Sequence, residues 1–142
     1  MLRERPGSGP PAALTAWAPA KVNLFLEVTA RRPDGYHALR TLIVAVSLYD
    51  TLEFSAAPPA TLSLSCTDPR LGTGPENLVV RAAELLRRHT GTDAGAAVRL
   101  TKRIPLEAGL AGGSTDAAAT LVGLNRLWGP VSYTHLTLPT KA

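Results

Sequence analysis

A run of small residues, 108–115, separates a segment of alternating polarity from a segment of helical periodicity. Every residue in this run except Leu110 is small, so main-chain amides can approach a ligand without intervening side chains. The helix predicted to follow would direct unpaired N–H groups and the positive end of its dipole at the same loop. Ser114 and Thr115 add hydroxyls that can bind phosphate oxygens. The order of strand, loop and helix therefore predicts a phosphate cradle.

Two better-known phosphate motifs do not fit this loop. It lacks the lysine of G-x-x-x-x-G-K-S/T, and its glycines do not follow G-x-G-x-x-G. The alternative is a glycine-rich turn in which Ser114 or Thr115 only caps the helix. The length of the small-residue run and the hydroxyls at its end favour the phosphate cradle.

Strands are predicted before this loop from residues that alternate along the chain. From Lys21 the alternation predicts a strand with one buried face, formed by Val22, Leu24, Leu26 and Val28. Lys21 and Asn23 would then project from the opposite face, roughly 7 Å apart. A turn is predicted at residues 31–35, RRPDG. Residues 39–48 are nearly all apolar and predict a strand buried on both faces, which residues 51–54 would continue after Asp50.

The remaining elements complete an α+β fold. Alternation predicts short strands over residues 62–66 and 97–104, the second with Val98 and Leu100 on one side. One helix is predicted between an Asn77 cap and a Gly91 stop, and another from about Thr115 to Trp128. Their apolar stripes are predicted to be Leu78, Ala82, Leu85 and His89, and Ala117, Leu121, Leu124 and Trp128. We expect a mixed sheet of four or five strands with both helices on one face.

Composition agrees with one globular domain. The 142 residues are 45% hydrophobic and 18% charged, and the net charge of +4 comes from scattered basic residues, which suit a small phosphorylated ligand as well as a nucleic acid. The single Cys66 cannot form an internal disulfide or a zinc cluster. No apolar run approaches the ~20 residues of a membrane span, and the N-terminus lacks the apolar core of a signal peptide. These features favour a cytoplasmic protein.

The two ends of the chain differ in composition from its centre. Residues 1–13 are rich in Pro and Gly and predict a flexible lead-in, and residues 14–130 are expected to form the domain. Residues 131–142, VSYTHLTLPTKA, continue neither period. We interpret them as a non-native tail that resembles translated adapter sequence, a genuine polar tail being the alternative, and we assign no function to Tyr133 or His135.

Three segments resemble the GHMP kinases. Residues 105–116, PLEAGLAGGSTD, resemble the second signature of that superfamily. Together with residues 18–24, APAKVNL, and residues 32–37, RPDGYH, they resemble the 4-diphosphocytidyl-2-C-methyl-D-erythritol kinase family over about residues 17–128. The resemblance implies a ribosomal protein S5 domain 2-like fold, and ATP as co-substrate with Mg²⁺. It also implies phosphorylation of a hydroxyl of a cytidine-diphosphate-linked methylerythritol, in the non-mevalonate route to isoprenoid precursors.

The resemblance also implies roles for individual residues. It makes Lys21 the catalytic residue, which acts electrostatically, and Asn23, Tyr36 and His37 substrate-binding residues, with Tyr36 stacking on cytosine. Ser114 would contact the metal indirectly. The implied ATP-binding residues are Asn77 and Lys102 near the adenine, and the loop residues Pro105, Leu106, Glu107, Ala108, Gly109, Leu110, Ala111, Gly112, Gly113, Ser114 and Thr115.

Several of these residues also have structural interpretations. A lysine on a strand can be a solvated surface residue, a Tyr-His pair after a turn can be ordinary packing, Asn77 can be only a helix cap, and Lys102 an exposed lysine at a strand end. The Glu107 carboxylate would repel a triphosphate unless it turns outward or acts through the metal, and we have no account of its role.

One motif of the resembled family is missing. The family takes the proton of the acceptor hydroxyl with an aspartate in a later G-A-D-V/I-P motif, which nothing after Trp128 matches. We therefore expect a truncated N-terminal domain, inactive by itself, whose partner is the missing C-terminal domain of the same chain. The alternatives are a GHMP kinase with another acceptor, such as mevalonate or homoserine, and an S5-like RNA-binding domain. The 5% aromatic content disfavours the second.

Overall fold

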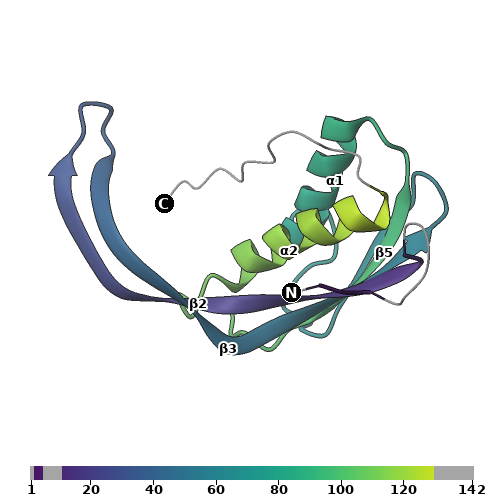
Figure 1. Cartoon of the computed structure of the whole chain (residues 1–142), viewed down its shortest axis with the longest axis horizontal. Helices are drawn as coiled ribbons and strands as arrows, with labels where there is room; N and C mark the ends of the chain where they lie inside the picture. The colour runs from purple at the N-terminus through teal and green to yellow at the C-terminus, as the bar shows by residue number, and fades with distance from the viewer. Residues whose placement is uncertain (1, 5–10, 130–142) are drawn as a thin grey trace.

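The computed structural model describes residues 2–4 and 11–129, which form one mixed sheet with two helices on one of its faces (Figure 1). The strands are β1 (Leu2–Glu4), β2 (Ala13–Arg31), β3 (His37–Ala57), β4 (Leu62–Cys66) and β5 (Gly95–Thr101), and the helices are α1 (Leu78–Thr90) and α2 (Gly112–Leu127). The strand order is β1-β2-β3-β5-β4, antiparallel except for the parallel pair β4–β5. The α+β prediction is confirmed.

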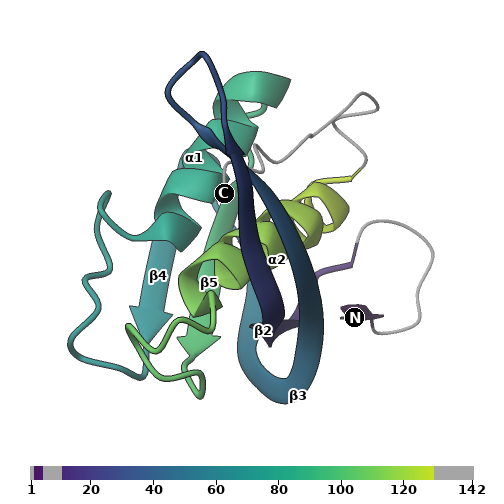
Figure 2. The same ribbon diagram turned by 90° about the vertical axis from the view of Figure 1, so that its left-hand side faces the viewer.

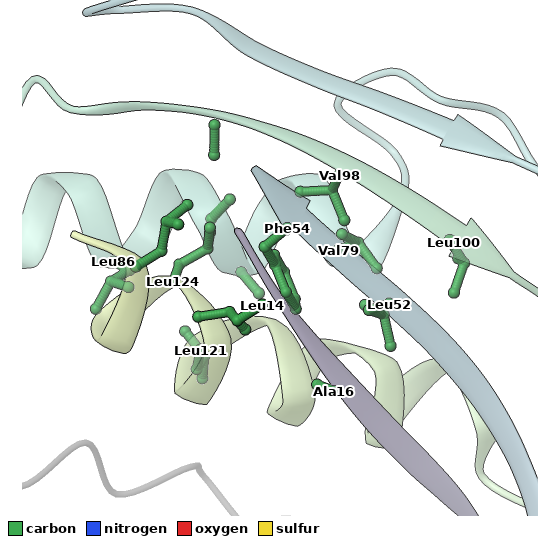
Figure 3. Packing of buried hydrophobic residues seen from close by; sticks show 14 of the residues in the cluster. Leu14, Ala16, Leu52, Phe54, Val79, Leu86, Val98, Leu100, Leu121 and Leu124 are labelled. Carbon is green, nitrogen blue, oxygen red and sulfur yellow. The ribbon is translucent and has the colours of Figure 1, made fainter. Parts of the chain in front are cut away.

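The hydrophobic core lies between the helices and the inner halves of the long strands. Phe54 of β3 and Leu14 of β2 face Leu86 of α1 and Leu124 of α2 (Figure 3). Buried residues alternate along the start of β2 and are small beyond Leu14, which lets α2 approach the sheet closely. At Gly123 of α2, a Cβ atom would lie 2.5 Å from the Phe54 ring. The core therefore covers only the half of each long strand next to α2.

Helix α1 begins and ends where the sequence predicts. The Asn77 side chain accepts a hydrogen bond from Val79 N–H, and Gly91 ends the helix in a left-handed conformation, with φ 70°. The predicted stripe is wrong except at Ala82. Leu78 and Leu85 are exposed, and the buried residues are Val79, Ala82, Ala83 and Leu86. The helix is rotated from the predicted phase because α2 and the sheet contact it on that face.

Helix α2 begins earlier than the sequence predicts, at Gly112 instead of about Thr115. Leu121 and Leu124 of the predicted stripe are buried, whereas Ala117 and Trp128 are only partly buried. Two polar residues, Asp116 and Thr120, occupy buried positions on the same side. A polar residue at a buried helix position needs a partner, and Thr120 has one because its hydroxyl donates to Asp116 O at 2.8 Å.

The outer halves of β2 and β3 form a two-stranded arm that leaves the body of the domain and then bends toward the side of the sheet on which the helices lie (Figures 1 and 2). We define the arm as residues 21–49. The prediction that Val22, Leu24, Leu26 and Val28 form a buried face is wrong, and so is the prediction that residues 39–48 are buried on both faces. Leu24 is 65% exposed, and the other exposed apolar residues of the arm are Phe25, Leu26, Val28, Tyr36, Leu39, Leu42, Ile43, Val44 and Tyr49. Both helices lie over the inner halves of the strands, so no described element covers the arm.

Other predicted strands are largely confirmed. The strand over residues 62–66 is β4, and Val98 and Leu100 are buried in β5, which ends at Thr101 rather than at residue 104. Residues 2–4 of the predicted lead-in pair with β2 as β1, whereas residues 1, 5–10 and the predicted tail at 131–142 lie outside the described residues. Within residues 2–4 and 11–129, no helix is long and apolar enough to cross a membrane.

Candidate nucleotide site

The glycine-rich loop, residues 105–111, joins the end of β5 to an uncapped α2. Ala111 occupies the N-cap position in a left-handed conformation, with φ 56°, and has no side chain that can bond the first turn. Thr115 Oγ1 instead bonds Gly112 O at 3.0 Å, which excludes the alternative that this hydroxyl caps the helix. Gly113 and Ser114 are exposed. The first N–H groups of α2 are therefore open to an anion.

Close packing beneath the loop requires glycine at the start of α2. A Cβ atom at Gly112 would lie 3.0 Å from Ile104 Cγ2 and 3.2 Å from Lys102 Nζ, and one at Gly113 would lie 3.1 Å from Leu78 Cδ1. The helix N-terminus thus sits directly on Lys102, on the residue preceding the loop and on the first turn of α1. Strain is present too, because Glu107 has a φ of 58°, which is uncommon for a residue with a side chain.

Lys21 lies beside this loop. Its main-chain N–H donates to Leu110 O at 3.0 Å, although the two residues are far apart in the sequence. Lys21 pairs with Ala45 and Asn23 with Ile43 in unbroken register, so the two side chains share a face of β2 as predicted. The structure thus brings the predicted catalytic lysine to the predicted phosphate cradle.

Tyr36 and His37 lie at the tip of the arm, apart from the glycine-rich loop (Figures 1 and 2). The tip is a tight turn, in which Arg32 N–H donates to Tyr36 O at 2.6 Å and Tyr36 N–H donates to Asp34 Oδ1 at 3.1 Å. Tyr36 is 60% exposed, so its ring is not packed into the turn. The structure leaves this ring free for a ligand but does not bring it to the loop.

Asn77 caps α1, and both the oxygen and the nitrogen of its side-chain amide form hydrogen bonds. Its Oδ1 accepts from Val79 N–H at 2.9 Å, and its Nδ2 donates to Gly72 O at 2.8 Å. Asn77 is buried at the start of α1, close to the packing of Leu78 against Gly113. The structural interpretation of Asn77 is therefore correct, and a contact with adenine stays a prediction.

Lys102 is enclosed by two buried carboxylates instead of standing exposed at a strand end. Its ammonium lies 2.5 Å from Asp50 Oδ2 and 2.9 Å from Asp116 Oδ2, and its side chain is 4% exposed. This cluster was not predicted from the sequence. The available signals were one aspartate between two predicted apolar strand segments, at residue 50, and another inside a predicted helix, at residue 116.

The buried cluster displaces the pKa values of its members. Burial raises the pKa of Asp116 to about 7, with a further upward contribution from the neighbouring Asp50, and Lys102 only partly opposes this. Burial also acts upward on the pKa of Asp50, but its interactions with Asp116, with the N–H groups of Ile104 and Arg103 and with Lys102 hold that pKa below its usual value. Desolvation lowers the pKa of Lys102, but both carboxylates outweigh it and raise that pKa overall. The cluster therefore holds one ammonium, one ionised carboxylate and one carboxyl that titrates near neutrality.

Residues 77–138 match the family model described as the GHMP kinases N terminal domain. A 4-diphosphocytidyl-2-C-methyl-D-erythritol kinase of Synechococcus sp. (strain CC9902) is 51% identical over 130 residues, which are 91% of this chain and 42% of that protein. A crystal structure of 4-(cytidine 5'-diphospho)-2C-methyl-D-erythritol kinase superposes with a TM-score of 0.67 at 46% identity, covering 80% of this chain and 40% of the other.

The same fold occurs in more distant proteins. A homoserine kinase of Cytophaga hutchinsonii superposes with a TM-score of 0.67 at 18% identity, covering 89% of this chain and 38% of the other, which supports the fold alone. The chain spans about two fifths of the length of the relatives that it matches. The family model, the similar sequences and the superposed structures agree with the loop geometry, and the chain therefore has the fold of a GHMP kinase N-terminal domain.

Proposed function

We propose that this chain supplies the nucleotide-binding part of an ATP-dependent small-molecule kinase. The observation that carries the proposal is the hydrogen bond from Lys21 N–H to Leu110 O, because it joins a lysine to a glycine-rich loop that ends in an uncapped helix. Phosphoryl transfer depends mainly on positioning and on electrostatic stabilisation of the transferring group. An uncapped helix N-terminus, together with the ammonium of a lysine whose main chain bonds the loop, would provide both.

The loop would bind the phosphates of ATP, and Lys21 would stabilise the charge that develops during phosphoryl transfer. Main-chain N–H groups at Gly112, Gly113 and Ser114 would hold the phosphate oxygens of ATP, since small residues leave them accessible. The Lys21 ammonium would stabilise the negative charge on the transferring phosphoryl group and orient the attacking hydroxyl. The general base that takes the hydroxyl proton is expected from the protein beyond this domain.

Magnesium would be held mainly by the phosphates. The described residues contain no group of three or more His, Cys, Asp or Glu side chains that could form a metal site. The exposed Ser114 fits an indirect role through a metal-bound water, and Mg²⁺ commonly keeps several waters beside substrate phosphates. The metal would neutralise charge on the phosphate oxygens.

We propose 4-diphosphocytidyl-2-C-methyl-D-erythritol as the acceptor. Similar proteins carry the name of that kinase at about 50% identity, and the Tyr36 ring is free for a planar base at the tip of the arm. His37 follows it and can hydrogen-bond the polar edge of cytosine. The base would contact Tyr36, and the reacting hydroxyl would lie near Lys21.

Turnover is proposed to require a C-terminal domain of the same protein. The chain covers 42% of the similar Synechococcus protein, and the exposed apolar residues of the arm are available for packing against further protein. We therefore test binding on this chain and turnover on the chain joined to the C-terminal part of a similar kinase.

Replacing Lys21 by alanine tests the catalytic proposal. We expect kcat in the joined protein to fall by about 10²-fold or more, since a group that stabilises developing charge is lost. Thermal unfolding should be unchanged, because the side chain is not part of the core. An equal kcat in Lys21→Ala would remove Lys21 from the mechanism, and Arg81→Ala, on the exposed surface of α1, is the matched control.

Replacing Tyr36 by alanine tests the acceptor. We expect the KM for the cytidine-linked acceptor to rise roughly tenfold, because base stacking is worth about 1–3 kcal/mol. The KM for ATP should not change. If the variant binds cytidine diphosphate as the wild type does, in a titration followed by calorimetry, an acceptor without a nucleobase is favoured.

A further inference from the structure

Asp50 fixes the entrance to the glycine-rich loop. Its Oδ1 accepts hydrogen bonds from the N–H groups of Arg103 at 2.7 Å and of Ile104 at 2.9 Å. Ile104 is buried and directly precedes the loop. Because Asp50 lies within β3, these bonds tie the chain that leaves β5 to the neighbouring strand. Without Asp50, the buried N–H group of Ile104 would have no acceptor, which is costly.

Lys102 connects this entrance to the exit of the loop. Its ammonium bonds Asp50 Oδ2, and it also bonds Asp116 Oδ2 in the first turns of α2. A Cβ atom at Gly112 would lie 3.2 Å from the same Nζ atom, so the ammonium sits directly beneath the first residue of the helix. One cation therefore joins both ends of the loop to β3.

The buried cluster lies behind the loop rather than at its exposed surface. The side chains of Asp50, Lys102 and Asp116 are almost completely enclosed, at 0%, 4% and 3% exposure. Moving the ammonium out to a ligand would leave Asp50 and Asp116 facing each other without a cation, which is strongly unfavourable for buried carboxylates. A direct contact of Lys102 with nucleotide would therefore cost more than it gains.

We propose that Asp50, Lys102 and Asp116 are positioning residues, which hold the glycine-rich loop and the N-terminus of α2 in the geometry that binds phosphate. They act through the main chain of residues 103–112 and touch no substrate. The inference rests on the proposed function for its effect on nucleotide affinity, but its effect on loop order can be measured without nucleotide. It assigns Lys102 a role different from the predicted contact with adenine.

Two substitutions of Asp116 separate the effect of losing its bond to Lys102 from the effect of changing its charge. Asp116→Leu keeps the branched shape of the side chain but is larger and cannot accept a bond from Lys102, whereas Asp116→Asn keeps an oxygen for that bond. The matched control is Arg99→Met in β5, which removes an exposed ion pair to Glu53 of β3. For each form of the chain, amide hydrogen exchange of residues 106–115 is measured without nucleotide, together with thermal unfolding and the affinity for Mg·ATP.

We expect the leucine variant to exchange its loop amides about tenfold faster and to bind Mg·ATP about tenfold more weakly, while amides of β4 and α1 keep their protection. The asparagine variant and the Arg99→Met control should match the wild type in both measurements. Rescue by asparagine is the outcome that a role in global stability alone does not produce.

A second variant covers the case in which Asp116→Leu does not fold. The triple substitution Asp50→Asn, Lys102→Met and Asp116→Leu replaces the whole charged cluster by neutral side chains, which buried sites often tolerate, and asparagine at position 50 keeps an oxygen for the two N–H groups. We expect this variant to unfold at about the wild-type temperature and still to show faster loop exchange and weaker nucleotide binding.

The outcomes distinguish this inference from the proposed function. If the folded leucine variant or the triple variant keeps wild-type loop exchange and wild-type affinity, the positioning inference is overturned and the nucleotide site stands. If the wild-type chain binds no nucleotide, the proposed function fails, and loop exchange still decides the inference. Faster exchange spread evenly over the whole chain in every variant would also overturn it.

Discussion

Asp116 combines a buried position, a shared cation and a raised pKa in one side chain. Its carboxyl faces Lys102 and Asp50, and no hydrogen-bond partner reaches its Oδ1 among the described residues. Burial of a carboxyl without full compensation disfavours its charged form. The protonation state of this residue should therefore be visible in the stability of the whole domain.

The pKa of Asp116 predicts how stability changes with pH. This carboxyl has a pKa of about 7 in the folded chain, against 3.8 when it is unperturbed, so the folded state retains a proton that the unfolded state releases. The free energy of unfolding should therefore fall as pH rises from about 4 to 7, by roughly 1–4 kcal/mol. Urea unfolding at intervals of pH measures it, and Asp116→Asn should flatten the curve.

Other shifted carboxylates act outside this window. Hydrogen bonds from Arg70 lower the pKa of Asp68 to about 2, and the pKa of Asp50 is lowered as well. Stability from a lowered pKa is present above the unfolded value and is lost as pH falls through the folded one, which here is below about 4. A slope between pH 4 and 7 that persists in Asp116→Asn would contradict the assignment to Asp116.

At the scale of elements, the sequence predicts correctly those features that depend only on a few consecutive residues. The cap at Asn77, the stop at Gly91 and the alternation over residues 62–66 each depend on a few consecutive residues, and all three are confirmed. The stripe of α1 and the start of α2 were wrong because they depend on contacts with distant segments. No local pattern reports that Gly112 must sit on Lys102 or that Leu86, rather than Leu85, meets the core.

The contact between α2 and the sheet predicts the effect of filling one glycine. Gly123→Ala should destabilise the domain although alanine favours helices, because the new Cβ atom would lie 2.5 Å from the buried Phe54 ring. Overpacking of this kind typically costs about 1–3 kcal/mol. Thermal and urea unfolding measure the change. Val122→Ala, on the exposed side of the same helix, should stay within about 0.5 kcal/mol, and an equal effect of the two substitutions would contradict the packing explanation.

At the scale of the molecule, the arm shows that periodicity predicts which residues share a strand face but not whether that face is buried. Alternation indicated that Lys21 and Asn23 share a face, and the unbroken register between them agrees with it, whereas a register shift between Asn23 and Phe25 interrupts the alternation further along β2. It did not indicate whether any element covers that face, because this depends on where both helices pack. The candidate site shows the same division: the loop and Lys21 were found from motifs, whereas the Asp50–Lys102–Asp116 cluster depends on three separate segments.

The exposed apolar residues of the arm predict self-association of the chain. A two-stranded arm with apolar side chains and unpaired outer edges is an attractive surface for a second copy. Replacing Leu26 and Ile43 by lysine should reduce association in sedimentation experiments without lowering the unfolding temperature, since both are exposed. Leu85→Lys, which changes an exposed leucine outside the arm, is the control, and an equal reduction by this control would exclude the arm as the cause.

The bond that seats Lys21 beside the loop comes from its main chain, not from its ammonium. Any amino acid except proline at position 21 can therefore donate the same main-chain hydrogen bond to Leu110 O. The side chain at this position can be exchanged while the backbone stays in place beside the loop. A cysteine introduced at position 21 would place a spectroscopic label or a cross-linker beside the glycine-rich loop.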